Sequence, residues 1–418
     1  MYNEQVVLNH WINSNDITLL KSKQIDRTYF FSLRDIYDWV EQYVAETGTL
    51  PSSKRMTVEF EDFKVLTDLD PLSYAVVKLT EAKAYVEYRP ILTANAKLVN
   101  EGGTLEALQH MKSNVDSMLK KYTSKLSEYS WIKEAQARYE KYMEKHGKDG
   151  LPGITTGLPG LDELTGGWKD DDMILISGRL NEGKSLVGLF FCFKAWMAFN
   201  KAGITDPVVY VSTEMPELEV AYRLDTMKAH FSNRALNEGK LGDSELYKEY
   251  TDELITKTCD FVILTNESNG GKQFSPTDIK TIIETKKPSF LCVDQLYDLV
   301  DDSGERDIRR KIVNITTSLR DVNLNTKTPV ILIAQAGRSA AKSARKGNNI
   351  TPELDEIQES DNPAQKATRV ITLRLIDNNF FVLSLKKNRG GKKNQDIFVE
   401  ADIDNGLWEE TVQEAEAF

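Results

Sequence analysis

The feature that most constrains this chain is a glycine-rich loop between an apolar run and an apolar helix-like segment. Residues 173–177 are a β-type apolar run, residues 178–185 read Gly-Arg-Leu-Asn-Glu-Gly-Lys-Ser, and residues 186–199 have the composition of a buried helix. Strand, loop and helix in this order are the context in which the Gly-x-x-x-x-Gly-Lys-Ser pattern indicates a phosphate-binding loop. The alternative, a glycine-rich turn that matches by chance, does not account for the flanking elements. The pattern therefore predicts a nucleoside triphosphate site.

The chemistry of this loop assigns a role to its residues. Two glycines let the loop curl so that backbone N–H groups point at phosphate oxygens, and the helix that follows adds the positive end of its dipole. Lys184 supplies a charge to the β- and γ-phosphates, and Ser185 supplies a hydroxyl ligand for Mg²⁺. The residues expected to bind the nucleotide are Gly178, Asn181, Glu182, Gly183, Lys184, Ser185 and Leu186.

Bulk properties restrict the class of protein. A chain of 418 residues suggests two or three domains. The sequence has no apolar run long enough to cross a bilayer and no signal peptide, so we expect no membrane contact. The net charge of −11 argues against a protein that coats nucleic acid with its whole surface, but not against one that grips a strand through local basic loops. Three scattered cysteines are typical of buried thiols in a reducing compartment such as the cytoplasm.

Residues 1–125 have helical patterns, which predict an all-α N-terminal domain. They contain no catalytic or ligand-binding motif, so we expect this domain to serve contacts between proteins. Ser32-Leu33-Arg34-Asp35 matches a capping box and predicts the start of one helix. Further helical patterns cover residues 71–88, ended by Arg89-Pro90, and residues 104–122.

Residues 126–152 are expected to form a linker region. A helix is predicted over residues 130–146, and glycines follow it. The aromatic stripe on one side of this helix consists of Trp131, Ala135, Tyr139 and Tyr142. This stripe either packs on its own chain or docks on a neighbouring subunit of a ring, as an amphipathic helix does in a groove.

Residues 153–418 alternate between β-like and α-like segments, which predicts an α/β domain with a mostly parallel sheet and helices on both faces. A hairpin of residues 370–375 and 380–385, joined by a turn at 377–379, is expected to extend this parallel core with antiparallel strands. The other expected strands are residues 173–177, 208–213, 261–264, 290–293 and 330–334.

Ligands of such a sheet gather at the carboxyl ends of its strands. Asp294 ends one apolar run about 110 residues after the loop, and this spacing predicts a carboxylate that holds Mg²⁺ directly or through water. Glu214 follows another strand and is our candidate for the base that activates water. Its alternative role is a charge that favours the next helix, which begins near Pro216. Gln335 ends a third strand, where its amide can sense the γ-phosphate.

Two local basic clusters stand out in this acidic chain. Residues 337–352 contain no acidic residue, and their cations are Arg338, Lys342, Arg345 and Lys346. A solvated charge run is the ordinary interpretation, but a basic loop beside a γ-phosphate sensor is suited to move a nucleic-acid backbone. The second cluster is residues 386–393, in which Lys387 and Arg389 are candidates to stabilise transition-state charge on the phosphates of an adjacent subunit.

Several of these segments resemble bacterial and phage replicative DNA helicases of the DnaB type, and the resemblance spans nearly the whole chain. Residues 156–167 are similar to the start of that family's RecA-like motor, and Ser212-Thr213-Glu214-Met215 is similar to its segment with the catalytic glutamate. Gln335 with Arg338-Ser339 resembles its sensor segment, and Lys387-Asn388-Arg389 its finger. The helical residues 1–125 also resemble the family's N-terminal collar.

The resemblance implies a RecA-like P-loop NTPase core and a homohexameric ring with ATP and Mg²⁺ at the subunit interfaces. It further implies a single DNA strand in the central channel, 5′→3′ movement that unwinds forked DNA, and contacts with a primase and a helicase loader. The location implied is the cytoplasm of a bacterium or of a phage-infected host cell.

Departures from the family pattern lie outside the proposed hydrolysis set. The strand-gripping loop, where relatives carry Arg-Glu-Ser-Gly, reads Gln358-Glu359-Ser360-Asp361 here, although Glu359 and Ser360 remain candidate DNA contacts. Gln295 follows Asp294 where an aromatic residue is common. These departures favour a divergent, phage-encoded member.

Two other classes of protein share the phosphate-binding loop. The first is a RecA-like recombinase or accessory DNA-dependent ATPase without unwinding; the second uses nucleotide only as a structural clamp. The helical N-terminal domain favours the helicase over the first, and Glu214 argues against the second, because a clamp needs no water-orienting carboxylate.

Overall fold

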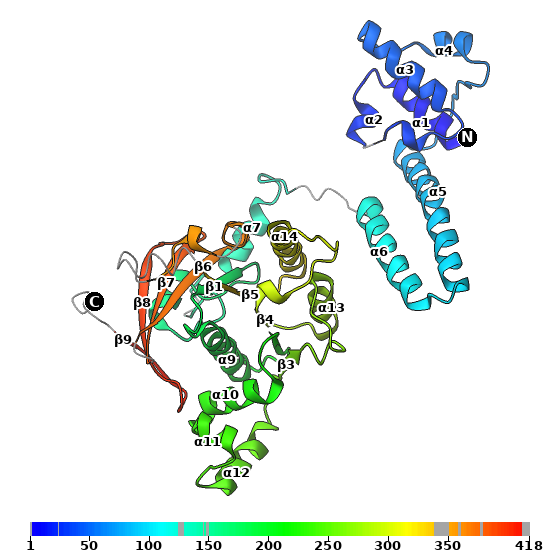
Figure 1. Cartoon of the computed structure of the whole chain (residues 1–418). Coiled ribbons are helices and arrows are strands. Elements are labelled where there is room, and N and C mark those ends of the chain that lie inside the picture. Colours follow the sequence, from blue (N-terminus) through cyan, green and yellow to red (C-terminus); the bar gives the residue numbers. More distant parts are fainter. Residues whose placement is uncertain are drawn as a thin grey trace. The chain divides into compact units, whose positions relative to one another are not determined.

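The computed structural model describes residues 2–23, 25–123, 129–144, 146–147, 150–337, 351–357, 361–376 and 379–411. The chain divides into two compact units, Met1–His146 and Gly147–Phe418 (Figure 1). The boundaries 1–125, 126–152 and 153–418 given above stay predictions. No helix in the described residues is both long and apolar enough to span a membrane.

The first unit is helical, as its sequence patterns predict. Its core is an aromatic and aliphatic cluster in which Tyr37 stacks on Trp11 at 5.5 Å and on Phe30 at 4.8 Å between ring centroids. The elements of this unit are α1 (Tyr2–Asn13), α2 (Leu19–Ser22), η1 (Arg27–Tyr29), α3 (Arg34–Thr47), α4 (Ser53–Glu59), α5 (Leu72–Asn100), α6 (Thr104–Thr123) and α7 (Ala135–Met143).

The capping box predicted at Ser32 is wrong. Helix α3 begins at Arg34 with Leu33 as its N-cap, and no side chain of that N-cap makes a capping bond. Instead, the buried carboxylate of Glu4 on α1 accepts hydrogen bonds from the backbone N–H groups of Ser32 and Leu33, at 3.0 and 2.9 Å. The Glu4 carboxylate, which is distant in the chain, therefore accepts hydrogen bonds from backbone N–H groups here, where a local capping side chain was expected.

Helix α5 continues through Pro90, where the sequence predicted a helix end. Proline removes the N–H that would bond the carbonyl four residues earlier, and that carbonyl belongs to Val86, an exposed residue that water can reach. Helix α6 also packs along α5, and Lys121 of α6 pairs with Glu87 at 2.7 Å, one turn before the proline. Tertiary packing therefore outweighs the local preference to break the helix.

The second unit contains a nine-stranded sheet in the order β3-β2-β4-β5-β1-β6-β7-β8-β9. Strands β3 to β6 in that order pair in parallel, and β7, β8 and β9 are added antiparallel. All the expected strands are present, and β8 and β9 are additional. Their bounds are β1 (Met173–Gly178), β2 (Val208–Ser212), β3 (Phe261–Thr265), β4 (Phe290–Asp294), β5 (Val330–Gln335), β6 (Arg369–Ile376), β7 (Phe380–Asn388), β8 (Gln395–Asp402) and β9 (Leu407–Thr411).

Helices cover both faces of this sheet, as predicted. Alternate residues of β1 point to opposite faces: Ile174 and Ile176 join a core with α9, whereas Met173 and Leu175 join a second core with α13 and α14. Figure 1 shows α10, α11 and α12 gathered beyond β3. The bounds are α8 (Pro159–Thr165), α9 (Lys184–Ala202), α10 (Glu217–Ala229), α11 (Asn233–Glu238), α12 (Ser244–Leu254), α13 (Pro276–Lys286), η2 (Leu296–Asp298), α14 (Ile308–Thr326), η3 (Leu354–Glu356) and α16 (Asn362–Lys366).

The first helix and the last strand of this unit are joined. The Gly160 N–H in α8 donates to the two carboxylate oxygens of Glu410 in β9, at 3.1 and 3.0 Å. Nearby, the buried Arg369 of β6 donates to the carbonyls of Thr165 and Gly167, at 2.9 and 2.6 Å, and pairs with Asp172 at 3.2 Å. The segment that leads into β1 is therefore fastened to β6 and β9.

Candidate nucleotide-binding site

The glycine-rich loop joins β1 to α9, as predicted, and its backbone needs residues that tolerate positive φ. Asn181 has φ +60° and Gly183 has φ +77°. A Cβ on Gly183 would lie 2.7 Å from Cε1 of Phe381, so even a methyl group would collide with the core. Gly183 is also the N-cap of α9 and supplies no side-chain cap. The helix therefore begins with backbone N–H groups available to an anion.

The side chains of the loop brace it from within. Glu182 accepts from the Arg179 backbone N–H at 2.7 Å and pairs with the Arg179 guanidinium at 3.3 Å. Lys184 Nζ donates to the Arg179 carbonyl at 2.8 Å. Burial lowers the pKa of Lys184, and the carboxylates of Glu182, Asp294 and Glu214 oppose that shift.

At the end of β4, Asp294 is 2% exposed and lies across from Ser212 in the parallel pairing with β2. Tyr210 donates a hydrogen bond of 2.6 Å to Asp294 Oδ2. Burial raises the pKa of Asp294, while hydrogen bonds from Tyr210 and Ser185 and the charge of Lys184 oppose that rise.

A carboxylate and a hydroxyl are the hard oxygen ligands that Mg²⁺ prefers, so Ser185 and Asp294 fit this ion. Within the described ranges no group of three or more His, Cys, Asp and Glu side chains is placed to hold a metal.

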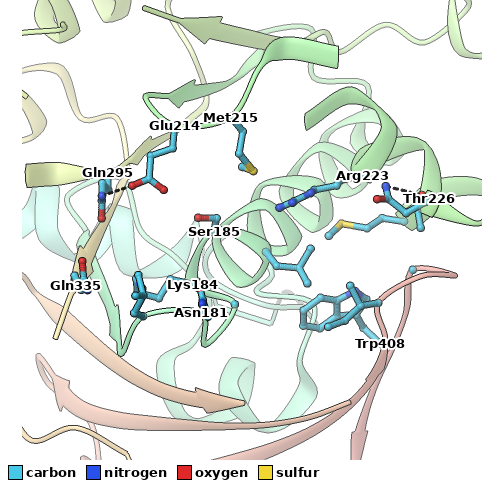
Figure 2. Close-up of a pocket in the computed structure, with 17 residues that line it drawn as sticks. Asn181, Lys184, Ser185, Glu214, Met215, Arg223, Thr226, Gln295, Gln335 and Trp408 are labelled. Atoms are coloured by element: carbon cyan, nitrogen blue, oxygen red, sulfur yellow. Dashed lines mark hydrogen bonds between the residues drawn. The ribbon is translucent and has the colours of Figure 1, made fainter. Parts of the chain in front are cut away.

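Glu214 and Gln335 reach the same edge of the sheet. Glu214 Oε1 accepts a hydrogen bond of 2.6 Å from Gln295 Nε2, and Figure 2 shows both side chains near Gln335 and the loop. Burial raises the pKa of Glu214 first, and the charges of Asp298 and Asp294 raise it further, against Lys184. Helix α10 begins only at Glu217, and Glu217 and Glu219 occupy its first turn. The helix-favouring role considered for Glu214 is therefore supplied by other residues.

These groups surround one cavity of about 470 Å³. Of the residues expected to bind nucleotide, Gly178 and Glu182 do not line it: Gly178 packs on Leu373, and Glu182 braces the loop. Several lining residues have no sequence motif and were not predicted. The lining residues are Leu180, Asn181, Gly183, Lys184, Ser185, Leu186, Glu214, Met215, Arg223, Thr226, Met227, Asn233, Gln295, Gln335, Ile403, Gly406 and Trp408.

The end of the cavity away from Glu214 is formed by the turn between β8 and β9. Asp404 of this turn accepts hydrogen bonds of 2.8 Å from the Ser232 hydroxyl and from the Arg234 N–H at the start of α11. Trp408 stacks on Phe190 and Phe381, at 4.6 and 5.1 Å between centroids. Because Asp404 lies about 170 residues after Ser232 and Arg234, no local sequence pattern predicts this wall.

The second basic cluster does not line the cavity. Lys387 Nζ donates to the carbonyls of Ala364 and Gln365, at 2.9 and 2.8 Å, and burial lowers its pKa. Arg389 is exposed, and its backbone N–H donates to the Thr368 carbonyl at 3.0 Å. The predicted DNA contacts Arg338, Lys342, Arg345, Lys346, Glu359 and Ser360, and the neighbouring Gln358, lie outside the described residues.

Comparison with protein families decides the classification. Residues 153–400 match the model of the DnaB-like helicase C-terminal domain. The chain belongs to the DnaB-like helicase family. This is a family of ATP-dependent replicative DNA helicases, so the expected enzyme class is confirmed and the recombinase and clamp alternatives are set aside.

Individual relatives agree with this assignment to the DnaB-like helicases. The chain is 24% identical over 394 residues to a probable replicative DNA helicase of Trieres chinensis, which covers 88% of this chain and 84% of that protein. It is 24% identical over 234 residues to the replicative DNA helicase DnaB of Haemophilus influenzae, which covers 55% of this chain and 47% of that protein. The match to the second relative thus spans about half of its length.

Solved structures show the same fold. A DnaB-like replicative helicase, studied with its interactions with primase, matches with a TM-score of 0.68 and 16% identity over 97% of this chain and 98% of that one. A second solved structure, of an ATPase domain, matches with a TM-score of 0.57 and 18% identity over 68% of this chain and 99% of that one. The expected RecA-like core behind a helical N-terminal region is confirmed.

Proposed function

We propose that this DnaB-like helicase hydrolyses ATP in the cavity described above and uses the energy to move 5′→3′ on single-stranded DNA and unwind forks. The observation that carries the proposal is that Lys184, Ser185, Glu214 and Gln335 line one cavity, beside Asp294 at the same edge of the sheet. A phosphate cradle, a metal-binding carboxylate and an exposed candidate base are the groups that phosphoryl transfer to water needs.

Each group has a distinct role in this proposal. The N-terminal N–H groups of α9 and the Lys184 ammonium bind the phosphates. Ser185 and Asp294 would hold Mg²⁺, which when bound supplies positive charge to the phosphate oxygens. Glu214 accepts a proton from the attacking water. Its pKa is raised toward neutral pH, which suits a general base. Gln335 senses the γ-phosphate.

The base of the nucleotide lies, in this proposal, at the end of the cavity formed by the β8–β9 turn. Met227, Ile403 and Trp408 supply apolar surface for a planar ligand there, and Arg223, Thr226 and Asn233 supply polar groups that can fix its orientation. The residues at this end are Arg223, Met227, Asn233, Ile403, Gly406 and Trp408.

Completion of the site by a second subunit is part of the proposal. Lys387 and Arg389 do not line the cavity of their own chain, which supports a role on the nucleotide of a neighbour in a homohexamer. The aromatic stripe of the linker is also available for such a contact, since Trp131, Tyr139 and Tyr142 are 75, 57 and 58% exposed. Mixing Arg389→Ala subunits with Glu214→Gln subunits should restore part of the ATPase activity, whereas a site within one chain predicts no rescue.

Further partners follow from family membership. The solved DnaB-like relative interacts with primase, and we propose a primase and a loader for this chain, with its basic loops on single-stranded and forked DNA. A cytoplasmic location, in a bacterium or in a phage-infected host cell, stays our prediction.

The deciding experiment compares two forked DNAs, one with a 5′ tail and one with only a 3′ tail, in the presence of ATP and Mg²⁺. We expect strand separation that depends on the 5′ tail. Unwinding that depends on the 3′ tail would contradict the polarity. DNA-stimulated hydrolysis without strand separation, even with a loader added, would contradict the unwinding.

A further inference from the structure

The side chain of Gln295 is bonded to the candidate base. Gln295 Nε2 lies 2.6 Å from Glu214 Oε1, and Figure 2 shows the two side chains pointing toward one another beside Gln335. The residues follow two adjacent parallel strands, β4 and β2, whose last pair in register is Ser212 with Asp294. The amide therefore reaches the carboxylate from the neighbouring strand end, at the edge where the phosphates are expected.

The backbones that carry these two side chains are tied together. The Thr213 N–H donates to the Asp294 carbonyl at 2.7 Å, and the Gln295 N–H donates to the Thr213 hydroxyl at 3.0 Å. The same hydroxyl lies 2.7 Å from Asp298 Oδ2. Since Thr213 precedes Glu214 directly, the positions from which both side chains start are fixed, and the amide-to-carboxylate bond fixes the end of Glu214.

The charges around Glu214 would not hold it in one place. Asp294 from β4 and Asp298 from η2 repel its carboxylate, whereas Lys184 from α9 attracts it, and Arg223 from α10 lines the same cavity. An exposed glutamate has three rotatable side-chain bonds, so these charges alone would favour several orientations, including one in contact with the lysine. A neutral donor can fix the carboxylate without neutralising it.

We propose that Gln295 is a positioning residue, which holds the Glu214 carboxylate where it can accept a proton from the attacking water. The inference rests on the proposed function, because it needs Glu214 to act as the base. Gln295 acts through Glu214, and the phosphates are bound by other groups. Its loss should therefore lower kcat and leave the KM for ATP nearly unchanged, since misorientation of a catalytic group affects the reaction step.

The test measures ATP turnover and KM with saturating single-stranded DNA for four variants of the full chain. Gln295→Ala should lower kcat by about 10-fold or more, and the isosteric Gln295→Glu, which has no N–H to donate and repels Glu214, should lower it further. KM should stay within about two-fold of the unmodified chain. Glu214→Gln should lose about 100-fold or more, and the double variant Glu214→Gln with Gln295→Ala should lose no more than Glu214→Gln alone.

A matched control is available on α3. Gln42 donates to Glu46 Oε1 at 2.9 Å, which is the same pair of groups on the exposed face of that helix. Gln42→Ala should leave kcat unchanged, and the binding of a fluorescent ATP analogue to Gln295→Ala should match that of the unmodified chain, which shows that the site is folded.

Separate results would overturn separate claims. Unchanged or raised turnover in Gln295→Ala, while Glu214→Gln is inactive, overturns the positioning role and keeps Glu214 as the base. An additional loss in the double variant, by the factor seen for Gln295→Ala alone, shows that Gln295 does not act through Glu214. Normal turnover of Glu214→Gln overturns the base assigned under the proposed function.

Discussion

The phenol of Tyr210 donates a hydrogen bond of 2.6 Å to Oδ2 of Asp294, and both side chains are buried in the sheet. The donor comes from β2 and the acceptor ends β4, so a neighbouring strand orients the carboxylate that we propose as the Mg²⁺ ligand. An ionised carboxylate has about four lone-pair sites, so Asp294 can accept from Tyr210 and Ser185 and still ligate an ion. The orientation of the Asp294 carboxylate is thus set by β2, the strand for which the sequence predicted only the candidate base Glu214.

Tyr210→Phe removes this hydrogen bond and keeps the ring. We expect the Mg²⁺ concentration for half-maximal turnover to rise about 10-fold, as is typical when a residue that orients a metal ligand is lost. The measurement is ATPase activity over a Mg²⁺ titration. Tyr250→Phe is the control, because Tyr250 donates to the buried Asp225 at 2.9 Å away from this site. An unchanged Mg²⁺ dependence in Tyr210→Phe would contradict the orienting role.

The pH dependence of turnover should follow Glu214. Burial, then Asp298 and Asp294, raise its pKa in the folded chain, so the protonated, inactive form persists to a higher pH than for an ordinary glutamate. Turnover should fall as the pH drops through that raised value. Asp298→Asn removes one repelling charge and keeps an oxygen for the Thr213 hydroxyl, so the acidic limb of the kcat profile should move to lower pH. A limb that moves to higher pH, or not at all, contradicts this assignment.

Gly406→Ala should weaken ATP binding without slowing the reaction step. A Cβ at Gly406 would lie 2.3 Å from the Thr226 carbonyl, so the β8–β9 turn must shift away from α10. We expect KM to rise about 10-fold, equivalent to about 1.4 kcal/mol, with kcat nearly unchanged. Gly239→Ala is the control, because Gly239 has a similar φ of +65° and nothing within 4 Å of a Cβ. Equal effects of both substitutions would assign the loss to backbone strain alone.

Arg369→Met should destabilise the second unit. It leaves Asp172 without its buried ion-pair partner and two carbonyls without their donor, so we expect the free energy of unfolding to fall by about 3–5 kcal/mol. Urea unfolding, followed by a probe of the second unit, measures this. Arg234→Met breaks an exposed pair with Glu238, 2.9 Å apart, and should change stability little. Similar stability of both variants would contradict the structural role of Arg369.

The sequence predicted those parts of the fold and the site whose signal is local. Strand β1, its loop and α9 are consecutive in the chain, and the parallel register pairs Asp294 with Ser212, two residues before Glu214. Parallel strands buried on both faces also have continuous apolar runs, which are easily recognised.

The parts that could not be predicted depend on partners far apart in the chain. Asp404 holds the β8–β9 turn at the start of α11 by accepting hydrogen bonds from Ser232 and Arg234. These residues lie 172 and 170 positions earlier in the chain. Strand β8 alternates between exposed and buried residues, and no residue of β9 is fully buried, so neither has the apolar run by which the other strands were found. The helix end predicted at Pro90 and the capping box predicted at Ser32 are wrong for the opposite reason. Local preferences are outweighed by packing at Pro90 and by the Glu4 carboxylate at Ser32.

The hydrogen bonds between Gly160 and Glu410 place the first helix and the last strand of the second unit next to each other. A peptide linker could therefore join β9 to α8, and the chain could be opened instead at an exposed turn such as residues 302–304. Such a circular permutant keeps every strand neighbour and changes only which loop is closed, a difference that costs little free energy. The architecture of this unit therefore does not depend on the order in which its elements follow one another along the chain.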